Sequence, residues 1–170
     1  LHCGTRISSR SISNPLGRFG SDVLARVTAA VRSATVSSEM KELCANTFRE
    51  VLFDFTAKDN FSLTELERVS VVANTAMLTL ITGENTEQLL QPEYWMAEVD
   101  FQPADMNCIK MMWGIDSTAE LTFVPSIAGF VGSDLLAAVY YTSMMDKKEC
   151  ALLIDFGTNS EMALWDGQRL

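Results

Sequence analysis

The segment from Ala151 to Trp165 constrains the fold of this chain more than any other part of the sequence. A short apolar run reaches Asp155 and is followed by a glycine and small polar residues, after which an apolar run resumes. Apolar runs of this length, separated by turn-forming residues, are typical of two strands joined by a tight turn. Asp166-Gly167 supplies a second turn signal. The segment therefore predicts a β-hairpin.

The turn of this predicted hairpin has residues that suit a phosphate group. Gly157 lets backbone N–H groups approach an anion closely, and the Thr158 hydroxyl group can donate a hydrogen bond to the same oxygen atoms. Asp155, at the mouth of the turn, is suited to hold a hydrated Mg²⁺. Ordinary turns use the same residue types, so the motif alone leaves both interpretations open.

Composition indicates a folded domain and excludes several kinds of partner. The 170 residues are 48% hydrophobic and 21% charged, which is normal for a globular domain. The formal net charge of −9 disfavours nucleic acids and anionic membrane surfaces, because both bind clustered Lys and Arg. No window supplies the roughly 20 apolar residues of a membrane span, and the first residues do not resemble a signal sequence. We therefore expect a cytoplasmic protein.

The cysteines give no sign of a metal centre. All four lie far apart in the sequence, without a Cys-x-x-Cys pair. Structural zinc and iron–sulfur sites need tighter clustering, so the spacing predicts buried or incidental thiols.

Apolar periodicity predicts the first elements of the chain. A helix capped by Ser21 or Asp22 extends to Val31, and a second helix spans residues 37–55. Before them, residues 6–12 fit a half-exposed strand. We expect both helices to cover a sheet.

The middle of the chain combines a strand, a polar corner and a helix. A capping box at residues 62–65 precedes a β-branched run over residues 68–73, and a helix over residues 75–82 ends at a glycine. This order places Asn74 and Thr75 at the carboxyl end of a strand, where open α/β sheets bind ligands. The alternative is that Asn74 only caps the helix.

The remaining segments differ in how clearly they can be interpreted. Residues 84–117 show no clear period, and for the apolar clusters around Trp95 and Trp113 packing is favoured over a partner surface. Residues 119–124 predict a buried strand. Residues 126–145 predict a long helix whose small residues allow close approach by a neighbouring backbone.

Five blocks of sequence, in order, resemble the reductive activators of corrinoid proteins, a branch of the actin, sugar-kinase and heat-shock-chaperone ATPase superfamily. These blocks are Asn14-Pro15, Phe19 to Val23, Ala73 to Met77, Pro125 to Asp134 and Ile154 to Glu161. The resemblance implies an α/β fold with an actin-like (ribonuclease H-like) ATPase lobe, in which helices flank a mixed sheet. Residues 1–148 correspond to the first lobe without its first strands, and residues 149–170 to the opening phosphate-loop hairpin of the second lobe. The predicted long helix corresponds to the connector between the lobes.

The resemblance also implies a function. Such activators use ATP to drive an uphill electron transfer that returns a Co(II) corrinoid to the Co(I) state. It implies ATP and Mg²⁺ as cofactors, an iron–sulfur cluster in the parent protein outside this chain, and a homodimer. The implied partner is the corrinoid protein of a methyltransferase system. The ATPase is expected to be slow, since no carboxylate occupies Pro125-Ser126 at the start of the connector.

The motifs of the family assign candidate site residues but no catalytic residue. The expected nucleotide-binding residues are Asp155, Gly157, Thr158, Asn159 and Glu161, with Asp155 holding Mg²⁺ through water. The residues expected close to the ligand are Asn74, Thr75, Ser126 and Asp134.

The sequence also departs from the family. Ser160 stands where glycine is usual and is expected to reshape the phosphate loop. The first phosphate loop and the adenosine-binding segment of the superfamily have no counterpart in residues 1–170. We therefore expect a piece from the middle of a domain, with open sheet edges where a strand is missing. The alternative function is a docking and dimerisation module with a degenerate nucleotide site.

Overall fold

The computed structural model describes residues 8–59, 61–156 and 160–170. It is a mixed α/β structure with two sheets of two strands each. The α-helices are α1 (Val23–Arg32), α2 (Ala34–Lys58), α3 (Thr75–Thr82), α4 (Met106–Trp113) and α5 (Ser133–Thr142). The strands are β1 (Arg68–Val71), β2 (Glu120–Phe123), β3 (Ala151–Phe156) and β4 (Ser160–Trp165). Short 3₁₀ turns cover Pro15–Phe19, Leu63–Glu65, Thr86–Leu90, Pro92–Tyr94 and Met144–Asp146.

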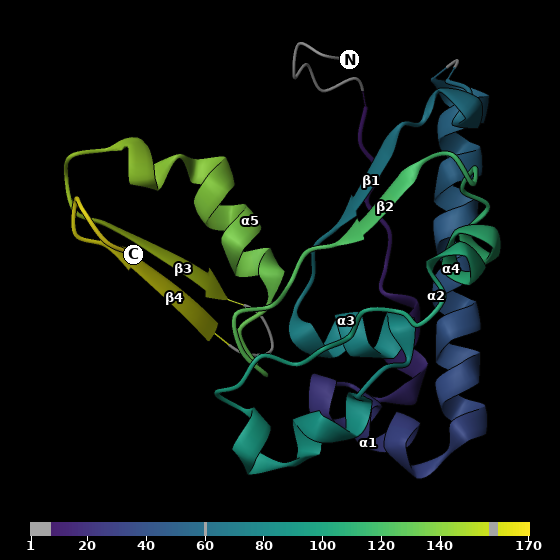
Figure 1. Cartoon of the computed structure of the whole chain (residues 1–170), viewed down its shortest axis with the longest axis horizontal. Coiled ribbons are helices and arrows are strands. Elements are labelled where there is room, and N and C mark those ends of the chain that lie inside the picture. The colour runs from purple at the N-terminus through teal and green to yellow at the C-terminus, as the bar shows by residue number, and fades with distance from the viewer. Residues whose placement is uncertain (1–7, 60, 157–159) are drawn as a thin grey trace.

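The elements form a larger part and a smaller part. Figure 1 shows β1, β2 and helices α1 to α4 on one side of the molecule, and α5 with the hairpin of β3 and β4 on the other. Each part has its own hydrophobic core. In the smaller part Leu135, Val139 and Met144 pack with Ala163 of β4, so α5 lies against the hairpin.

The main sheet is parallel and is covered on one face. β1 and β2 pair in register from Arg68 opposite Glu120 to Val71 opposite Phe123. Phe123 is buried and Val71 packs against the main core, on the side of α2 and α4 (Figure 1). The opposite face carries the exposed ion pair of Arg68 and Glu120 at 2.9 Å. This alternation follows from the two-residue period of a strand.

The hairpin and the helix after β1 form as the sequence predicts. β3 and β4 are antiparallel, with Ala151 opposite Trp165. In α3, the Asn74 side chain accepts a hydrogen bond from the Met77 N–H group, and Gly83 ends the helix in a left-handed conformation with φ +80°. The capping box at residues 62–65 is also present.

The predicted helix over residues 126–145 is wrong at both ends, because α5 covers only Ser133–Thr142 and a separate 3₁₀ turn follows it. The helix begins at Ser133, and residues 126–132 form a tight loop in which Ala128 pairs with Val131. The glycines explain the loop, because a Cβ atom on Gly129 would lie 2.5 Å from the Tyr94 carbonyl oxygen. A Cβ atom on Gly132 would lie 2.4 Å from the Asn74 Cα atom. Both glycines therefore let the loop pack directly on the backbone of other segments, Gly129 at Tyr94 and Gly132 at Asn74.

Two other predictions need correction, and one helix was missed. Residues 8–12 of the predicted strand are irregular, while residues 6–7 lie outside the described residues. The second helix begins earlier than predicted, at Ala34, because the Ser33 side chain accepts a hydrogen bond from Val36 N–H and caps it. Helix α4 was not predicted, because residues 84–117 show no clear apolar period. No helix in the described ranges combines the length and apolar character needed to cross a membrane.

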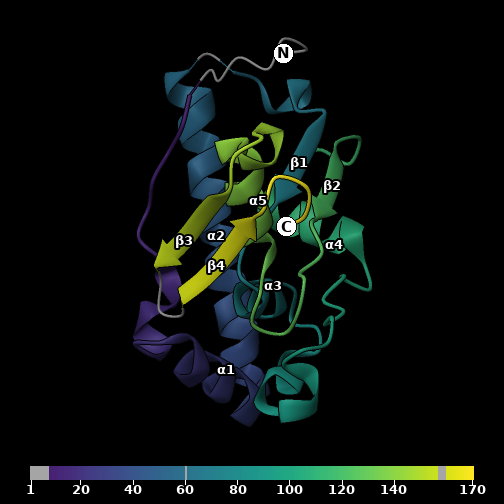
Figure 2. The same cartoon turned by 90° about the vertical axis from the view of Figure 1, so that its left-hand side faces the viewer.

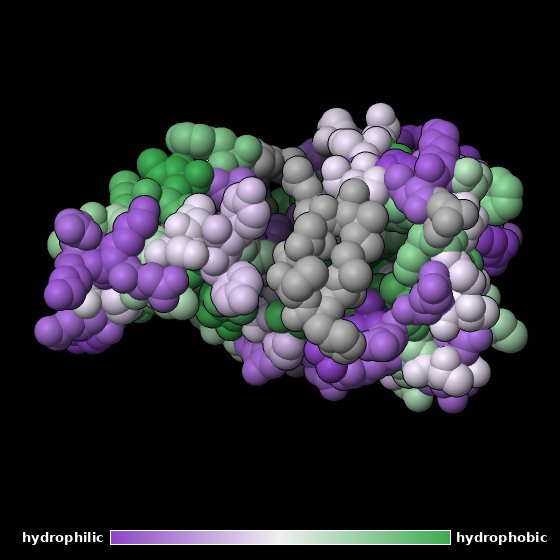
Figure 3. Space-filling view, turned by 90° about the horizontal axis from the view of Figure 1, so that it is seen from above, coloured by the Kyte–Doolittle hydropathy of each residue, from purple (hydrophilic) through white to green (hydrophobic). Residues whose placement is uncertain are grey.

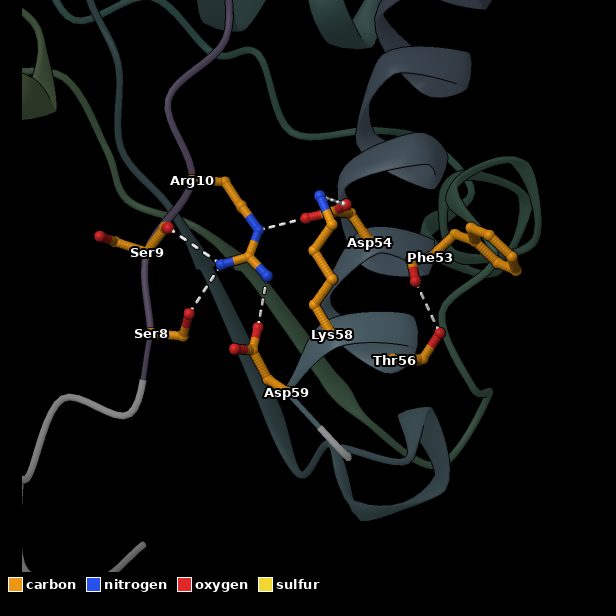
Figure 4. A network of polar contacts seen from close by, with 8 residues as sticks. All are labelled: Ser8, Ser9, Arg10, Phe53, Asp54, Thr56, Lys58 and Asp59. Atoms are coloured by element: carbon orange, nitrogen blue, oxygen red, sulfur yellow. Dashed lines mark hydrogen bonds and ion pairs between the residues drawn. The ribbon is translucent and has the colours of Figure 1, made fainter.

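The segment before the first helix is fastened to α2. Figure 4 shows the Arg10 guanidinium group between Asp54 and Asp59, with its remaining nitrogen donating to Ser8 Oγ at 2.7 Å. Lys58 pairs with the other oxygen of Asp54 at 2.6 Å. These contacts keep residues 8–12 extended along the end of α2.

Candidate functional site

The predicted site residues come from the corner after β1, the loop before α5 and the mouth of the hairpin. Figure 2 shows the hairpin lying across α5, with β3 and β4 side by side. Asp155 and Glu161 face each other across the hairpin in the strand register. Gly157, Thr158 and Asn159, which make up the predicted phosphate-binding turn, lie outside the described residues.

The start of α5 is tied to the corner after β1. The Ser133 N–H group donates to the Ala73 carbonyl oxygen at 3.1 Å, and the Ala73 N–H group donates to Ser133 Oγ at 3.2 Å. Ser133 is fully buried. The close approach of Gly132 to Asn74 brings the two backbones together at this point. Ser133 was not among the predicted site residues, although the small residues of this segment indicated close approach by a neighbouring backbone.

The residues at the corner have structural partners. The Asn74 side chain caps α3 by accepting a hydrogen bond from the Met77 N–H group, and its place close to the ligand stays a prediction. The Thr75 hydroxyl group is buried and donates to the Ala128 carbonyl oxygen at 2.8 Å, so it fixes the loop before α5. Its place close to the ligand stays a prediction. Ser126 Oγ is buried, and no hydrogen-bond partner for it exists in the described part of the chain.

A group of carboxylates lies where α5 meets the hairpin. Burial raises the pKa of Asp134 above its ordinary value, and the negative charge of Asp155 adds to this rise. Burial also raises the pKa of Glu161, to which the charges of Asp134 and Asp155 contribute. The three acids therefore share one region of negative potential, which favours a proton or a cation.

This donor set fits a hydrated cation better than a bare phosphate. Three neighbouring carboxylates repel an anion, whereas oxygen ligands are those that Mg²⁺ prefers, and Mg²⁺ commonly keeps several waters. Within the described ranges, no group of three or more His, Cys, Asp and Glu is arranged to hold a metal directly. The contact of Asp155 with Mg²⁺ through water stays a prediction.

Outside this region, apolar side chains are exposed. Trp113 is buried, but Met96 is 90% exposed and Met111 74% exposed. In the hairpin, the side chains on the face away from α5 are exposed, among them Leu152, Phe156 and Leu164. Figure 3 shows hydrophobic residues along one side of the part formed by α5 and the hairpin, whose far tip is hydrophilic.

Comparisons with known proteins give consistent results. A family model described as the RACo middle region matches residues 1–147. The corrinoid activation enzyme RamQ of Eubacterium limosum is 24% identical over 162 residues, which are 95% of this chain and 26% of that protein. The [Co(II) methylated amine-specific corrinoid protein] reductase of Methanosarcina barkeri is 28% identical over 140 residues, which are 76% of this chain and 24% of that protein.

A solved structure has a similar fold. It is described as a reductive activator for a corrinoid, iron–sulfur protein, and it matches with a TM-score of 0.71 and 22% identity. The match covers 90% of this chain and 24% of that chain. The chain thus spans about a quarter of the length of the relatives that it matches.

Proposed function

The chain belongs to the RACo middle region family, and from this premise we propose that it is part of an ATP-dependent reductive activator that returns a Co(II) corrinoid protein to Co(I) for methyl transfer. The observation that carries the proposal is the family match over residues 1–147. Both curated relatives carry names that describe action on corrinoid proteins.

The three carboxylates where α5 meets the hairpin support a role in binding a nucleotide with its metal ion. In the proposed function, Asp155 would hold Mg²⁺ through water, and Gly157 and Thr158 would bind the phosphate groups. Bound Mg²⁺ would supply the positive charge that offsets the carboxylates, and the nucleotide would link the hairpin to the rest of the protein. Glu161 and Asp134 hold the negative potential that selects a cation-bound nucleotide over a free anion.

The proposed coupling between nucleotide and electron transfer follows from the position of α5. The helix packs on the hairpin, and hydrogen bonds of Ser133 join its start to the corner after β1. A nucleotide that binds one arrangement of these parts more tightly increases the population of that arrangement. A partner protein that binds the same arrangement then binds more tightly, and the coupling free energy is the same in both directions. The electron itself comes from an iron–sulfur cluster elsewhere in the parent protein.

Replacing Asp155 in the full-length protein tests this proposal. We expect D155A to abolish the ATP-dependent formation of Co(I), followed by the absorbance of the corrinoid, and to weaken binding of Mg²⁺-ATP. E149A is the matched control, because Glu149 is an exposed acid just before the same hairpin. Unchanged activation by D155A would remove Asp155 from the proposed site.

The exposed apolar residues of the larger part favour a second candidate function, a docking and dimerisation module. Met96 and Met111 are largely exposed, and Trp95, which packs edge to face on Phe130, is 46% exposed. Measuring the size of the protein with and without ATP separates the two functions. A dimer that forms equally well in both conditions favours docking, whereas a dependence on ATP favours the nucleotide-driven activator.

A further inference from the structure

The loop before α5 is closed by its own hydrogen bonds. The Val131 carbonyl oxygen accepts from the N–H groups of Ile127 at 2.8 Å and Ala128 at 3.1 Å. The Val131 N–H group donates to the Ala128 carbonyl oxygen at 3.2 Å, so Gly129 and Phe130 form the tip of the loop. Because these bonds close the loop, its tip and the α5 residues that follow it are placed together.

One side of this loop is fastened to the corner after β1. The Thr75 hydroxyl group donates to the Ala128 carbonyl oxygen at 2.8 Å. The Ser133 N–H group donates to the Ala73 carbonyl oxygen at 3.1 Å, and Ser133 Oγ accepts from the Ala73 N–H group at 3.2 Å. Asp134 is the next residue, so the place of its carboxylate depends on how the loop is held.

The tip of the loop lies on the turn that contains Trp95. The rings of Phe130 and Trp95 meet edge to face, with their centres 5.8 Å apart and an angle of 76° between their planes. Beside this pair, a Cβ atom on Gly129 would lie only 2.5 Å from the Tyr94 carbonyl oxygen. Trp95 is 46% exposed, and part of the rest of its surface is covered by the loop.

Trp95 is itself anchored to the main core. Its indole N–H group donates to the carbonyl oxygen of Leu89 at 3.2 Å, and Leu89 is fully buried. Its backbone N–H group donates to the Pro92 carbonyl oxygen, and the Ala97 N–H group donates to that of Tyr94, both at 3.2 Å. The Trp95 ring is therefore held in place before Phe130 packs on it, and such an aromatic pair stabilises beyond its buried area.

We propose that Trp95 is a positioning residue for the candidate site. It holds Phe130 at the tip of the loop, and through the loop it fixes the start of α5, which carries Asp134. The loop lies between two supports, the corner after β1 and the turn that contains Trp95, and without the second support the start of α5 shifts. The inference rests on the proposed function, because it gives Trp95 a part in binding Mg²⁺-ATP at this site.

Residue-resolved hydrogen–deuterium exchange on the full-length protein tests whether Trp95 holds the start of α5. The reporters are the N–H groups of Ala73 and Ser133, which bond across the contact between the loop and the corner. We expect W95A to speed their exchange about 3–10-fold, because the aromatic pair no longer stabilises the closed arrangement. The reference is the N–H group of Ala45, which is buried in α2. Unchanged exchange at the reporters, or an equal increase at Ala45, would overturn the proposal.

Calorimetric titration of the same proteins with Mg²⁺-ATP tests the effect on the site. We expect W95A to weaken binding at least about threefold, because Asp134 moves from the place that suits the bound ion. W95F is expected to restore most of the affinity, since it keeps a ring against Phe130. M96A is the matched control, because Met96 is the next residue and is 90% exposed, and it should bind like the unsubstituted protein.

The outcomes of the titration separate this inference from the proposed function. If the unsubstituted protein does not bind Mg²⁺-ATP, the proposed function is wrong, and the role of Trp95 at the site is wrong with it. If the unsubstituted protein and W95A bind equally well, only the role of Trp95 is wrong. An equal loss in M96A and W95A, or no recovery in W95F, would also refute that role.

Discussion

At the scale of single residues, Ser133 joins the start of α5 to the corner after β1. Its backbone and hydroxyl group both bond to Ala73, and its side chain is fully buried. We expect S133A to lower the free energy of unfolding by about 1–3 kcal/mol, because the Ala73 N–H group loses its partner away from water. Denaturant unfolding of the full-length protein measures the change. S117A is the control, since Ser117 is exposed, and an equal effect of both would contradict the prediction.

Gly132 provides a second test of the contact between the start of α5 and the corner after β1. A Cβ atom there would lie 2.4 Å from the Asn74 Cα atom and 2.5 Å from the Ala73 carbonyl oxygen, so the backbones must separate to admit alanine. We expect G132A to destabilise the protein by about 1–3 kcal/mol through overpacking. G17A is the matched control, because a Cβ atom at Gly17 has nothing within 4 Å. A G132A variant as stable as G17A would show that the two parts do not meet there.

Asp134 is expected to make the stability of the folded protein depend on pH. Its pKa in the folded state is raised, mainly by burial, so the folded protein holds this proton more tightly than the unfolded chain does. Stability therefore falls as pH rises from the ordinary value of 3.8 through the folded pKa, where the acid ionises in the folded state. We expect D134N to raise the midpoint of thermal unfolding at pH 7 and to reduce this pH dependence. Added Mg²⁺ is expected to stabilise the unsubstituted protein more than D134N.

The matched control for this pH series is D146N, because Asp146 is an exposed acid at the far end of α5. A parallel pH dependence in D134N and the unsubstituted protein would contradict the assignment of the buried charge to Asp134.

At the scale of elements, the segment before α1 depends on one side chain. Arg10 contacts two carboxylates of the α2 terminus, and its guanidinium group also lies 4.6 Å from the centre of the Phe55 ring. We expect R10M to release residues 8–12 from α2, which increases their hydrogen exchange and their cleavage by proteases. High salt should have a similar, weaker effect, because it screens these half-exposed pairs. R169M, which affects an exposed pair near the last residues, is the control.

Elements with local signals were predictable, and elements set by distant contacts were not. The helix after Asn74 has its cap and its terminal glycine within the sequence, and the prediction of residues 75–82 is confirmed. The loop over residues 126–132 depends on the backbone at Tyr94 and Asn74, which no local pattern shows. Residues 8–12 have the alternation of a strand but no strand to pair with in the described ranges.

The same distinction between local signals and distant contacts applies to the candidate site. The Asp155 and Glu161 pair follows from the register of an antiparallel hairpin, and the structure brings Asp134 into the same region of negative potential. The occupied hydroxyl group of Thr75 and the anchoring role of Ser133 depend on how the loop before α5 folds back on the corner after β1. Such contacts between segments far apart in sequence have no signature in either segment alone.

At the scale of the whole molecule, two surfaces are open to contact with other chains. One is the outer edge of β1, which is unpaired in the described ranges, and the other is the apolar face of the hairpin that points away from α5. The main sheet has two strands in the described ranges, fewer than an independently stable sheet usually needs. One face of the hairpin exposes Leu152, Ile154 and Met162, together with other apolar side chains. Both surfaces are of the kind that the rest of a larger protein covers, and both become contact surfaces when they are left uncovered.

We therefore expect residues 1–170, produced alone, to self-associate at concentrations where the full-length protein does not, as measured by light scattering. The sheet edge can be tested separately with S70K, because a lysine on an edge strand opposes edge-to-edge pairing. T122K is the matched control, since Thr122 lies opposite Ser70 on the same exposed face but on β2. S70K should reduce association of the fragment and T122K should not. If both substitutions act equally, the effect is not specific to β1, and the prediction that its outer edge is the contact surface is wrong.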